Sequence, residues 1–201
     1  MTDDGRQHGE FTTTDDVKIH YVTIGDTGSA TVTVSATGLT PTGTVTLKDG
    51  GTVVDTATLA AGQATFKLSA LNVGSHTLTA GYSGDDRVNA GTGTATLTVN
   101  KASSTISATF SPNKLTTRSE PTATVTVASS AATVQATGTV ILTVLNSKGK
   151  EVASGTAALS GGSAIITGPR LAVGTYTATV VYSGSPAVTG SSRSYTITVV
   201  K

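Results

Sequence analysis

Apolar and polar residues alternate along most of the chain with the two-residue period of a half-buried β-strand. Residues 29–35 read SATVTVS, which places Val32 and Val34 on one face and threonines on the other. The same alternation recurs in 76–82 and 94–99, and glycine-rich turn signals separate the alternating stretches. No stretch shows the period of an amphipathic helix. The pattern therefore predicts an all-β protein built as a sandwich or barrel.

The alternation also predicts which side chains form the core. In the first half these are Val32, Val34, Val45, Leu47, Leu78, Ala80, Leu97 and Val99. In the second half they are Val125, Val127, Val140, Leu142, Ala178, Val180, Ile197 and Val199.

The second half of the chain repeats the order of the first. LNVGSHTLTAGYSGD at 71–85 returns as LAVGTYTATVVYSGS at 171–185, and SATVTVS at 29–35 returns as TATVTVA at 122–128. The extra residues of the second half fall between the alternating stretches, as expected for a duplicated fold with insertions in its turns. Each half has the usual size of a seven-stranded immunoglobulin-like sandwich.

We therefore predict two tandem immunoglobulin-like β-sandwiches with an N-terminal extension. The extension covers 1–16, which is acidic and poor in apolar residues, and the domains cover 17–101 and 102–201. The extension is expected to be flexible or to serve as an anchor. The join at 99–107 lacks a long glycine- or proline-rich linker, which predicts limited hinge motion between the domains.

Gly74 and Gly174 begin the repeated motif, and Tyr82 and Tyr182 end it. We expect the glycines to form the turn before a strand. The tyrosines could stack on a sugar, but the structural interpretation is a ring that closes the core and bonds to a turn. Features kept in both halves are those that the fold needs.

Several of these segments together resemble a known family. TGTVTLKDGG at 42–51, LNVGSHTLTAGYSGDD at 71–86 and TATLTV at 94–99 are similar to the bacterial immunoglobulin-like repeats. Such repeats occur in large surface and secreted proteins of bacteria and on bacteriophage virions, so the resemblance implies a structural or adhesive role. It implies little about a ligand, because one sandwich hosts many functions.

Composition and charge exclude several classes of function. The net charge is +1, from 13 basic and 12 acidic residues, which argues against a nucleic-acid partner. Cysteine is absent, so disulfides and thiolate chemistry are excluded. No window is apolar for the length that a membrane span needs, so no membrane insertion is expected. Hydroxyl side chains supply most of the polar surface.

A calcium site is the first candidate for chemistry. Asp49, Asp55, Asp85 and Asp86 carry the hard oxygen ligands that calcium needs. The alternative is that they are solvated turn residues. The second half has Ser185 in the place of Asp85, so we expect no metal site.

Histidines and lysines offer two further candidates. A hydrolytic triad needs a serine beside a histidine, but His8, His20 and His76 accompany no nucleophile motif. We expect His76, which has Tyr176 as its counterpart, to be a packing residue. No catalytic residue and no cofactor is predicted, and the enzyme hypothesis is set aside.

An intramolecular isopeptide bond would need Lys18 or Lys101 beside a buried acid. The three glutamates, Glu10, Glu120 and Glu151, lie on no predicted core face. We therefore do not expect this bond.

The leading functional hypothesis is a non-catalytic decoration protein on a bacteriophage virion. A chain that starts at Met and has no export signal suits assembly in the cytoplasm and release by lysis. Val17, Ile19, Tyr21 and Ile24 form the predicted anchor to a capsid or tail protein. The two domains would then offer threonine-rich faces for weak adhesion to host-surface glycans or proteins.

The alternative is a spacer or adhesion module of a secreted bacterial surface protein or enzyme. It would be located outside the cell or on the cell surface instead of on a virion.

Overall fold

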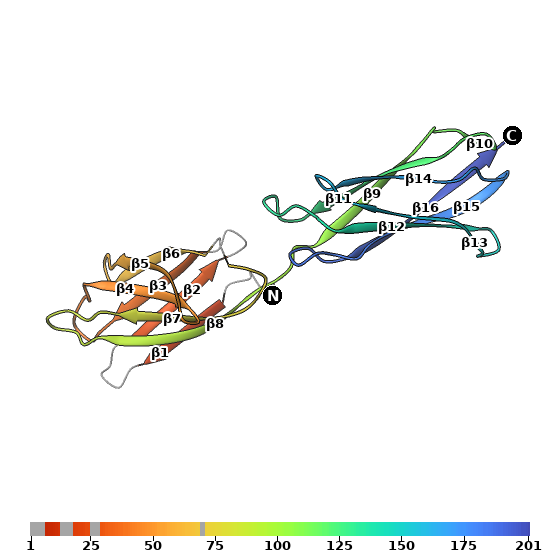
Figure 1. The fold of residues 1–201 in the computed structure, drawn as a ribbon. Helices are drawn as coiled ribbons and strands as arrows, with labels where there is room; N and C mark the ends of the chain where they lie inside the picture. Colours follow the sequence, from red (N-terminus) through yellow and green to blue (C-terminus); the bar gives the residue numbers. More distant parts are fainter. Residues whose placement is uncertain (1–6, 13–17, 25–28, 69–70) are drawn as a thin grey trace. The chain divides into compact units, whose positions relative to one another are not determined.

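The structure is a computed structural model that describes residues 7–12, 18–24, 29–68 and 71–201, with side chains from residue 29 onward. It divides into two compact units, Met1–Val99 and Asn100–Lys201, which we call the first and second domain. Both are built from β-strands (Figure 1). In the described ranges no helix is long and apolar enough to cross a membrane.

The first domain contains two four-stranded sheets that face each other. Its strands are β1 (Gln7–Thr12), β2 (Lys18–Ile24), β3 (Ser29–Ser35), β4 (Thr44–Asp49), β5 (Thr52–Thr58), β6 (Gln63–Lys67), β7 (Gly74–Tyr82) and β8 (Gly91–Val99). The order in one sheet is β1-β2-β3-β6 and in the other β5-β4-β7-β8. All of these pairs are antiparallel.

The second domain has a three-stranded and a five-stranded sheet. Its strands are β9 (Ser104–Ser111), β10 (Leu115–Thr116), β11 (Thr122–Ser129), β12 (Thr139–Asn146), β13 (Glu151–Ala158), β14 (Ser163–Thr167), β15 (Gly174–Tyr182) and β16 (Ser191–Val200). The orders are β14-β11-β9 and β10-β16-β15-β12-β13. Short β10 pairs with β16 in parallel, and the other pairs are antiparallel. The predicted tandem immunoglobulin-like fold is confirmed.

Each domain encloses its own hydrophobic core between its two sheets. Every core residue that the alternation predicts is buried except Val99. Val99 is the last residue of β8 and is only partly buried, so its assignment to the core was wrong. The strand ends there, and the side chain packs against the margin of the core.

Two buried valines lie in loops, where no alternation marks them. Val88 is 5% exposed and Val188 is 0% exposed. The carbonyl oxygen of Val88 accepts the backbone N–H of Asp85 at 2.8 Å, and that of Val188 accepts the N–H of Ser185 at the same distance. The loop before the last strand of each domain therefore folds back and inserts one valine into the core.

The N-terminal part of the chain differs from the predicted extension. Residues 7–12 form β1, which pairs with β2, and β2 pairs in turn with β3. Of the predicted anchor residues, Ile19 lies opposite Val34 and Tyr21 opposite Val32, while Ile24 ends β2. Both backbone edges of β2 are therefore paired within the first domain. The fourth predicted anchor residue, Val17, lies outside the described residues.

The residues just after the domain boundary belong to the second domain. The backbone N–H of Ala102 donates to the carbonyl oxygen of Ala187 at 3.0 Å, and the N–H of Thr189 donates to that of Ala102 at 2.8 Å. The ammonium group of Lys101 donates to the carbonyl oxygen of Ser185 at 2.9 Å. The chain between β8 and β9 is thus held by the 185–189 loop. The limited hinge motion stays a prediction.

Candidate functional site

The repeated glycines and tyrosines occupy equivalent places in the two domains. Gly74 is the first residue of β7 and Gly174 the first of β15. Gly74 has a φ of +145°, a conformation that a residue with a side chain rarely adopts. Each glycine starts the strand that the repeated tyrosine ends, as the sequence motif predicts.

The tyrosine rings are too buried to stack on a sugar, since Tyr82 is 3% and Tyr182 is 1% exposed. The hydroxyl of Tyr182 donates to the carbonyl oxygen of Thr137 at 2.9 Å. Among the described side chains, the hydroxyl of Tyr82 is the buried polar atom that lacks a hydrogen-bond partner. Burial and the neighbouring Asp85 carboxylate raise the pKa of Tyr82 to about 12. Both tyrosine rings are therefore structural core residues. They differ in the hydroxyl group, which forms a hydrogen bond in Tyr182 and not in Tyr82.

Asp85 connects two loops of the first domain. One carboxylate oxygen accepts the backbone N–H and the hydroxyl of Thr42 at 2.7 and 2.9 Å. The other accepts the N–H groups of Arg87 and Val88, each at 2.8 Å. These bonds, first that from the Thr42 backbone, hold the pKa of Asp85 well below its ordinary value. In the second domain Ser185 makes one of the equivalent bonds, since its hydroxyl oxygen accepts the backbone N–H of Val188 at 3.1 Å.

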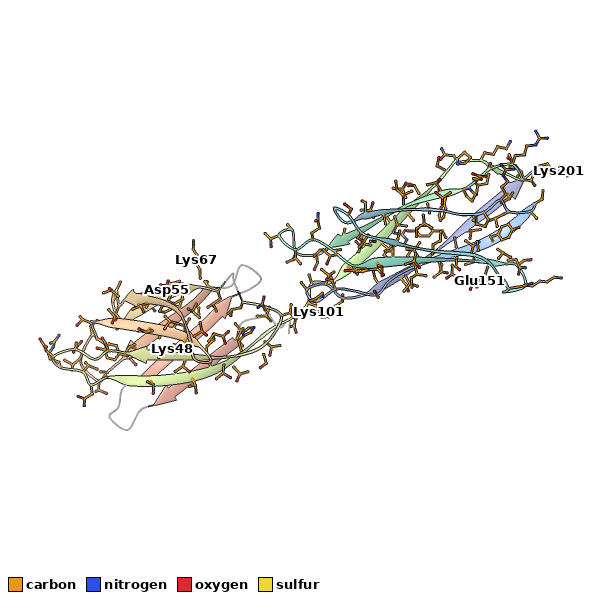
Figure 2. All side chains as sticks on the ribbon, in the orientation of Figure 1. Lys48, Asp55, Lys67, Lys101, Glu151 and Lys201 are labelled. Atoms are coloured by element: carbon orange, nitrogen blue, oxygen red, sulfur yellow. The ribbon has the colours of Figure 1, made fainter. Side chains whose placement is uncertain are left out.

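The aspartates considered for calcium do not come together. Thr42, which Asp85 binds, precedes β4, whereas Asp49 is the last residue of this strand. Six residues of β-strand span about 20 Å, so the two carboxylates lie at opposite ends of the domain. Asp55 is exposed on β5 and accepts the N–H of Thr56 (Figure 2). Among the described residues, no group of histidine and acidic side chains could hold a metal ion.

His76 is held by two hydrogen-bond acceptors. Its Nδ1 lies 2.7 Å from Oδ2 of Asp49, and its Nε2 lies 2.7 Å from the carbonyl oxygen of Asn72. A protonated imidazole donates to both at once. The Asn72 carbonyl, followed by the Asp49 carboxylate, therefore raises the pKa of His76. The sequence predicted packing, and the structure adds an ion pair; the two ring nitrogens face Asp49 and Asn72, not a serine hydroxyl.

An apolar cavity of about 20 Å³ lies between the sheets of the second domain. Its lining includes Ile166 and Gly168. The first domain has Phe66 and Leu68 at these positions, and both are buried. The cavity has room for about one water molecule. It therefore results from smaller side chains in the core and offers no pocket of ligand size.

A family model for the bacterial Ig-like domain (group 3) matches residues 15–100 and again 106–200. The chain belongs to this family. The two matched ranges correspond to the two domains and together cover most of the chain. Bacterial Ig-like domains are typical of surface proteins and of spacers in glycosidases.

Solved structures give more distant similarities. The fibronectin(III)-like modules of Clostridium thermocellum CbhA are 15% identical over 85% of each chain, with a TM-score of 0.37. The FN1-FN3 domains of chicken CNTN1 are 14% identical, with a TM-score of 0.33, over 86% of this chain and 60% of theirs. A β-glycosidase from Bacteroides vulgatus is 9% identical, with a TM-score of 0.32, over 87% and 22%. No curated protein matches the chain.

Proposed function

We propose that this chain is a non-catalytic display and spacer module of an extracellular surface, with a bacteriophage virion as its setting. The observation that carries the proposal is the presence of two tandem bacterial Ig-like domains over nearly the whole chain. A spacer needs only folded domains in series, and each domain has its own core.

The side chains that could have carried chemistry support the same role. Asp85 and His76 are engaged in bonds that hold loops to strands, and Tyr82 and Tyr182 are core residues. Catalysis needs titratable groups that converge in a cleft with room for substrate. The described residues show no such convergence, and the cavity of the second domain is about 20 Å³.

Attachment to a capsid or tail protein is part of this proposal, but we do not assign it to the backbone edges of the strand that carries the predicted anchor residues. Residues 18–24 form β2, whose two edges are already bonded to β1 and β3. An anchor at this strand would have to break one of these pairings. The threonine-rich outer faces remain the surfaces offered for weak contacts with host glycans or proteins.

Immunogold electron microscopy tests this proposal. An antibody against the second domain is applied to intact particles and cells from the native source. We expect label on the outside of phage particles, at the capsid or the tail. Label confined to the bacterial surface or to secreted material would replace the virion by the alternative setting, a spacer of a secreted protein. Label only inside lysed cells would overturn the display function.

A further inference from the structure

The outer face of the five-stranded sheet in the second domain carries an exposed apolar pair. Ile141 of β12 and Val181 of β15 lie directly opposite each other, and they are 44% and 40% exposed. The row across the sheet through this pair is Thr156, Ile141, Val181, Ser192. The pair thus lies on the two central strands, away from the sheet margins.

The first domain lacks this pair at the same register. Its equivalent row is Thr56, Thr46, Gly81, Thr92. There the hydroxyls of Thr46 and Thr56 lie 3.0 Å apart and bond to each other. One step along β4 the first domain also exposes Lys48, where the second domain has Thr143 (Figure 2). At these three positions the first domain has a hydroxyl, a glycine and a charge. The second domain has two aliphatic side chains and a neutral residue instead.

We call the surface that contains Ile141 and Val181 the second-domain outer face, and define it by the residues whose side chains share that side of the sheet. They are Thr139, Ile141, Thr143, Leu145, Ser154, Thr156, Ala158, Thr175, Thr177, Thr179, Val181, Ser192, Ser194, Thr196 and Thr198. Glu151 of β13 lies opposite Leu145 in the last row of this face and is its one ionisable residue. Arg193 of β16 bonds through its guanidinium group to the carbonyl oxygen of Ile106 on β9.

We propose that the second-domain outer face binds the same face of a second molecule of this chain. A two-fold contact places each patch against itself, so like charges on a patch would meet and repel. The rows around Ile141 and Val181 carry no charge and avoid this cost, and they would satisfy no charged partner, while Glu151 lies in the last row. The net charge of +1 adds little repulsion between whole molecules.

The size of the face sets the strength of the contact. Four strands about 4.8 Å apart and about eight residues long offer roughly 500 Å² per molecule, or about 1,000 Å² for the pair. This area is at the lower limit of specific interfaces. The contact is therefore weak for free molecules and becomes effective where many copies are held close together. The inference does not depend on the virion setting.

The test is a concentration series of the full chain by sedimentation velocity, up to about 1 mM, with amide chemical shifts recorded at each concentration. We expect reversible dimers and shift changes that are largest on β12 and β15. A monomer at every concentration overturns the proposal, and so does a dimer whose shifts map to another face.

The first domain supplies the matched variants. The double variant I141T/V181G copies the row of the first domain, and we expect at least tenfold weaker dimerisation. T143K copies Lys48 and places two like charges in the contact, so we expect no dimer. Unchanged dimerisation in either variant, with the far-ultraviolet circular dichroism of the folded chain retained, overturns the proposal.

The reciprocal graft T46I/G81V adds the apolar pair to the first domain. A Cβ at Gly81 would lie 3.8 Å from the backbone carbonyl oxygen of Thr46, so the valine has space. Together with K48T, this variant should associate beyond the dimer because it has two contact faces. Association no stronger than that of the parent chain would contradict the role of the pair.

Discussion

His76 and Tyr176 occupy equivalent positions and make the same hydrogen bond with different chemistry. Nε2 of His76 lies 2.7 Å from the carbonyl oxygen of Asn72, and the hydroxyl of Tyr176 donates to that of Ala172 at 2.8 Å. Each ring thus ties its strand to the turn four residues earlier. Only the histidine has an acidic partner, Asp49, so only the first domain gains a bond that changes with pH.

The pH dependence of the first domain follows from His76. Its pKa is raised above the ordinary value of 6.5 in the folded state. The folded state therefore binds the proton more tightly, so this stabilisation is complete below pH 6.5 and is lost as pH rises through the folded pKa. Amide hydrogen exchange resolves the two domains, and protection of the first should fall as the pH rises above 6.5.

The control for this prediction is H76Y, which copies the second domain. It keeps a ring that can reach the carbonyl oxygen but removes the ion pair. We expect the loss of protection above pH 6.5 to disappear, apart from effects shared with the second domain. An equal loss in H76Y and the parent chain would contradict the assignment to His76.

Asp85 should give the opposite response in acid. Its folded pKa is depressed, so the stabilisation is present above the ordinary pKa of 3.8 and is lost as pH falls towards the folded value. D85S copies the second domain and keeps one short acceptor, so it should lower the unfolding temperature of the first domain at neutral pH. The difference between D85S and the parent should shrink in acid, and a constant difference would disprove the link.

The turn between β5 and β6, like its counterpart in the second domain, has a residue with positive φ, and exchanging its identity between the domains tests backbone strain. Ala61 has a φ of +51°, and its counterpart Gly161 has a φ of +59°. Alanine is strained in this left-handed conformation, whereas glycine is not. A61G should stabilise the first domain by about 0.5–1 kcal/mol, and G161A should destabilise the second by a similar amount. Chemical denaturation followed by domain-resolved spectra measures both, and effects of the same sign would contradict the strain.

The two tyrosines should respond differently to loss of the hydroxyl. Y182F removes the bond to the carbonyl oxygen of Thr137 and should cost about 1 kcal/mol. Y82F removes a buried hydroxyl that forms no hydrogen bond but lies beside the Asp85 carboxylate, so it should cost less than Y182F. Thermal unfolding of both variants makes the comparison. A cost for Y82F as large as that for Y182F would show that its hydroxyl is bonded in solution.

Much of the fold follows from the sequence because an outer layer of threonine and an inner layer of valine produce a clear two-residue period. Val32 and Val34 are fully predictable in this way, and so are the strand starts at Gly74 and Gly174. Val188 is not, because loop residues follow no period even when they are buried.

The side chains of the candidate sites were harder to predict. The segment TGTVIL reads as a continuous apolar run around Ile141, which does not reveal that this side chain faces outward. The signal was the replacement of Thr46 by Ile141 between the two repeats. The bonds of His76 and Asp85 could not be foreseen either, because their partners lie 27 and 43 residues away in the chain.

The central claim is that the chain is a tandem pair of folded spacer domains, each stabilised by its own core. Single-molecule force extension of the full chain tests it most directly. We expect two separate unfolding events, each releasing about 30 nm of chain, since a domain of some 90 residues extends by about 3.5 Å per residue. A single event that releases the whole chain at once would contradict the claim.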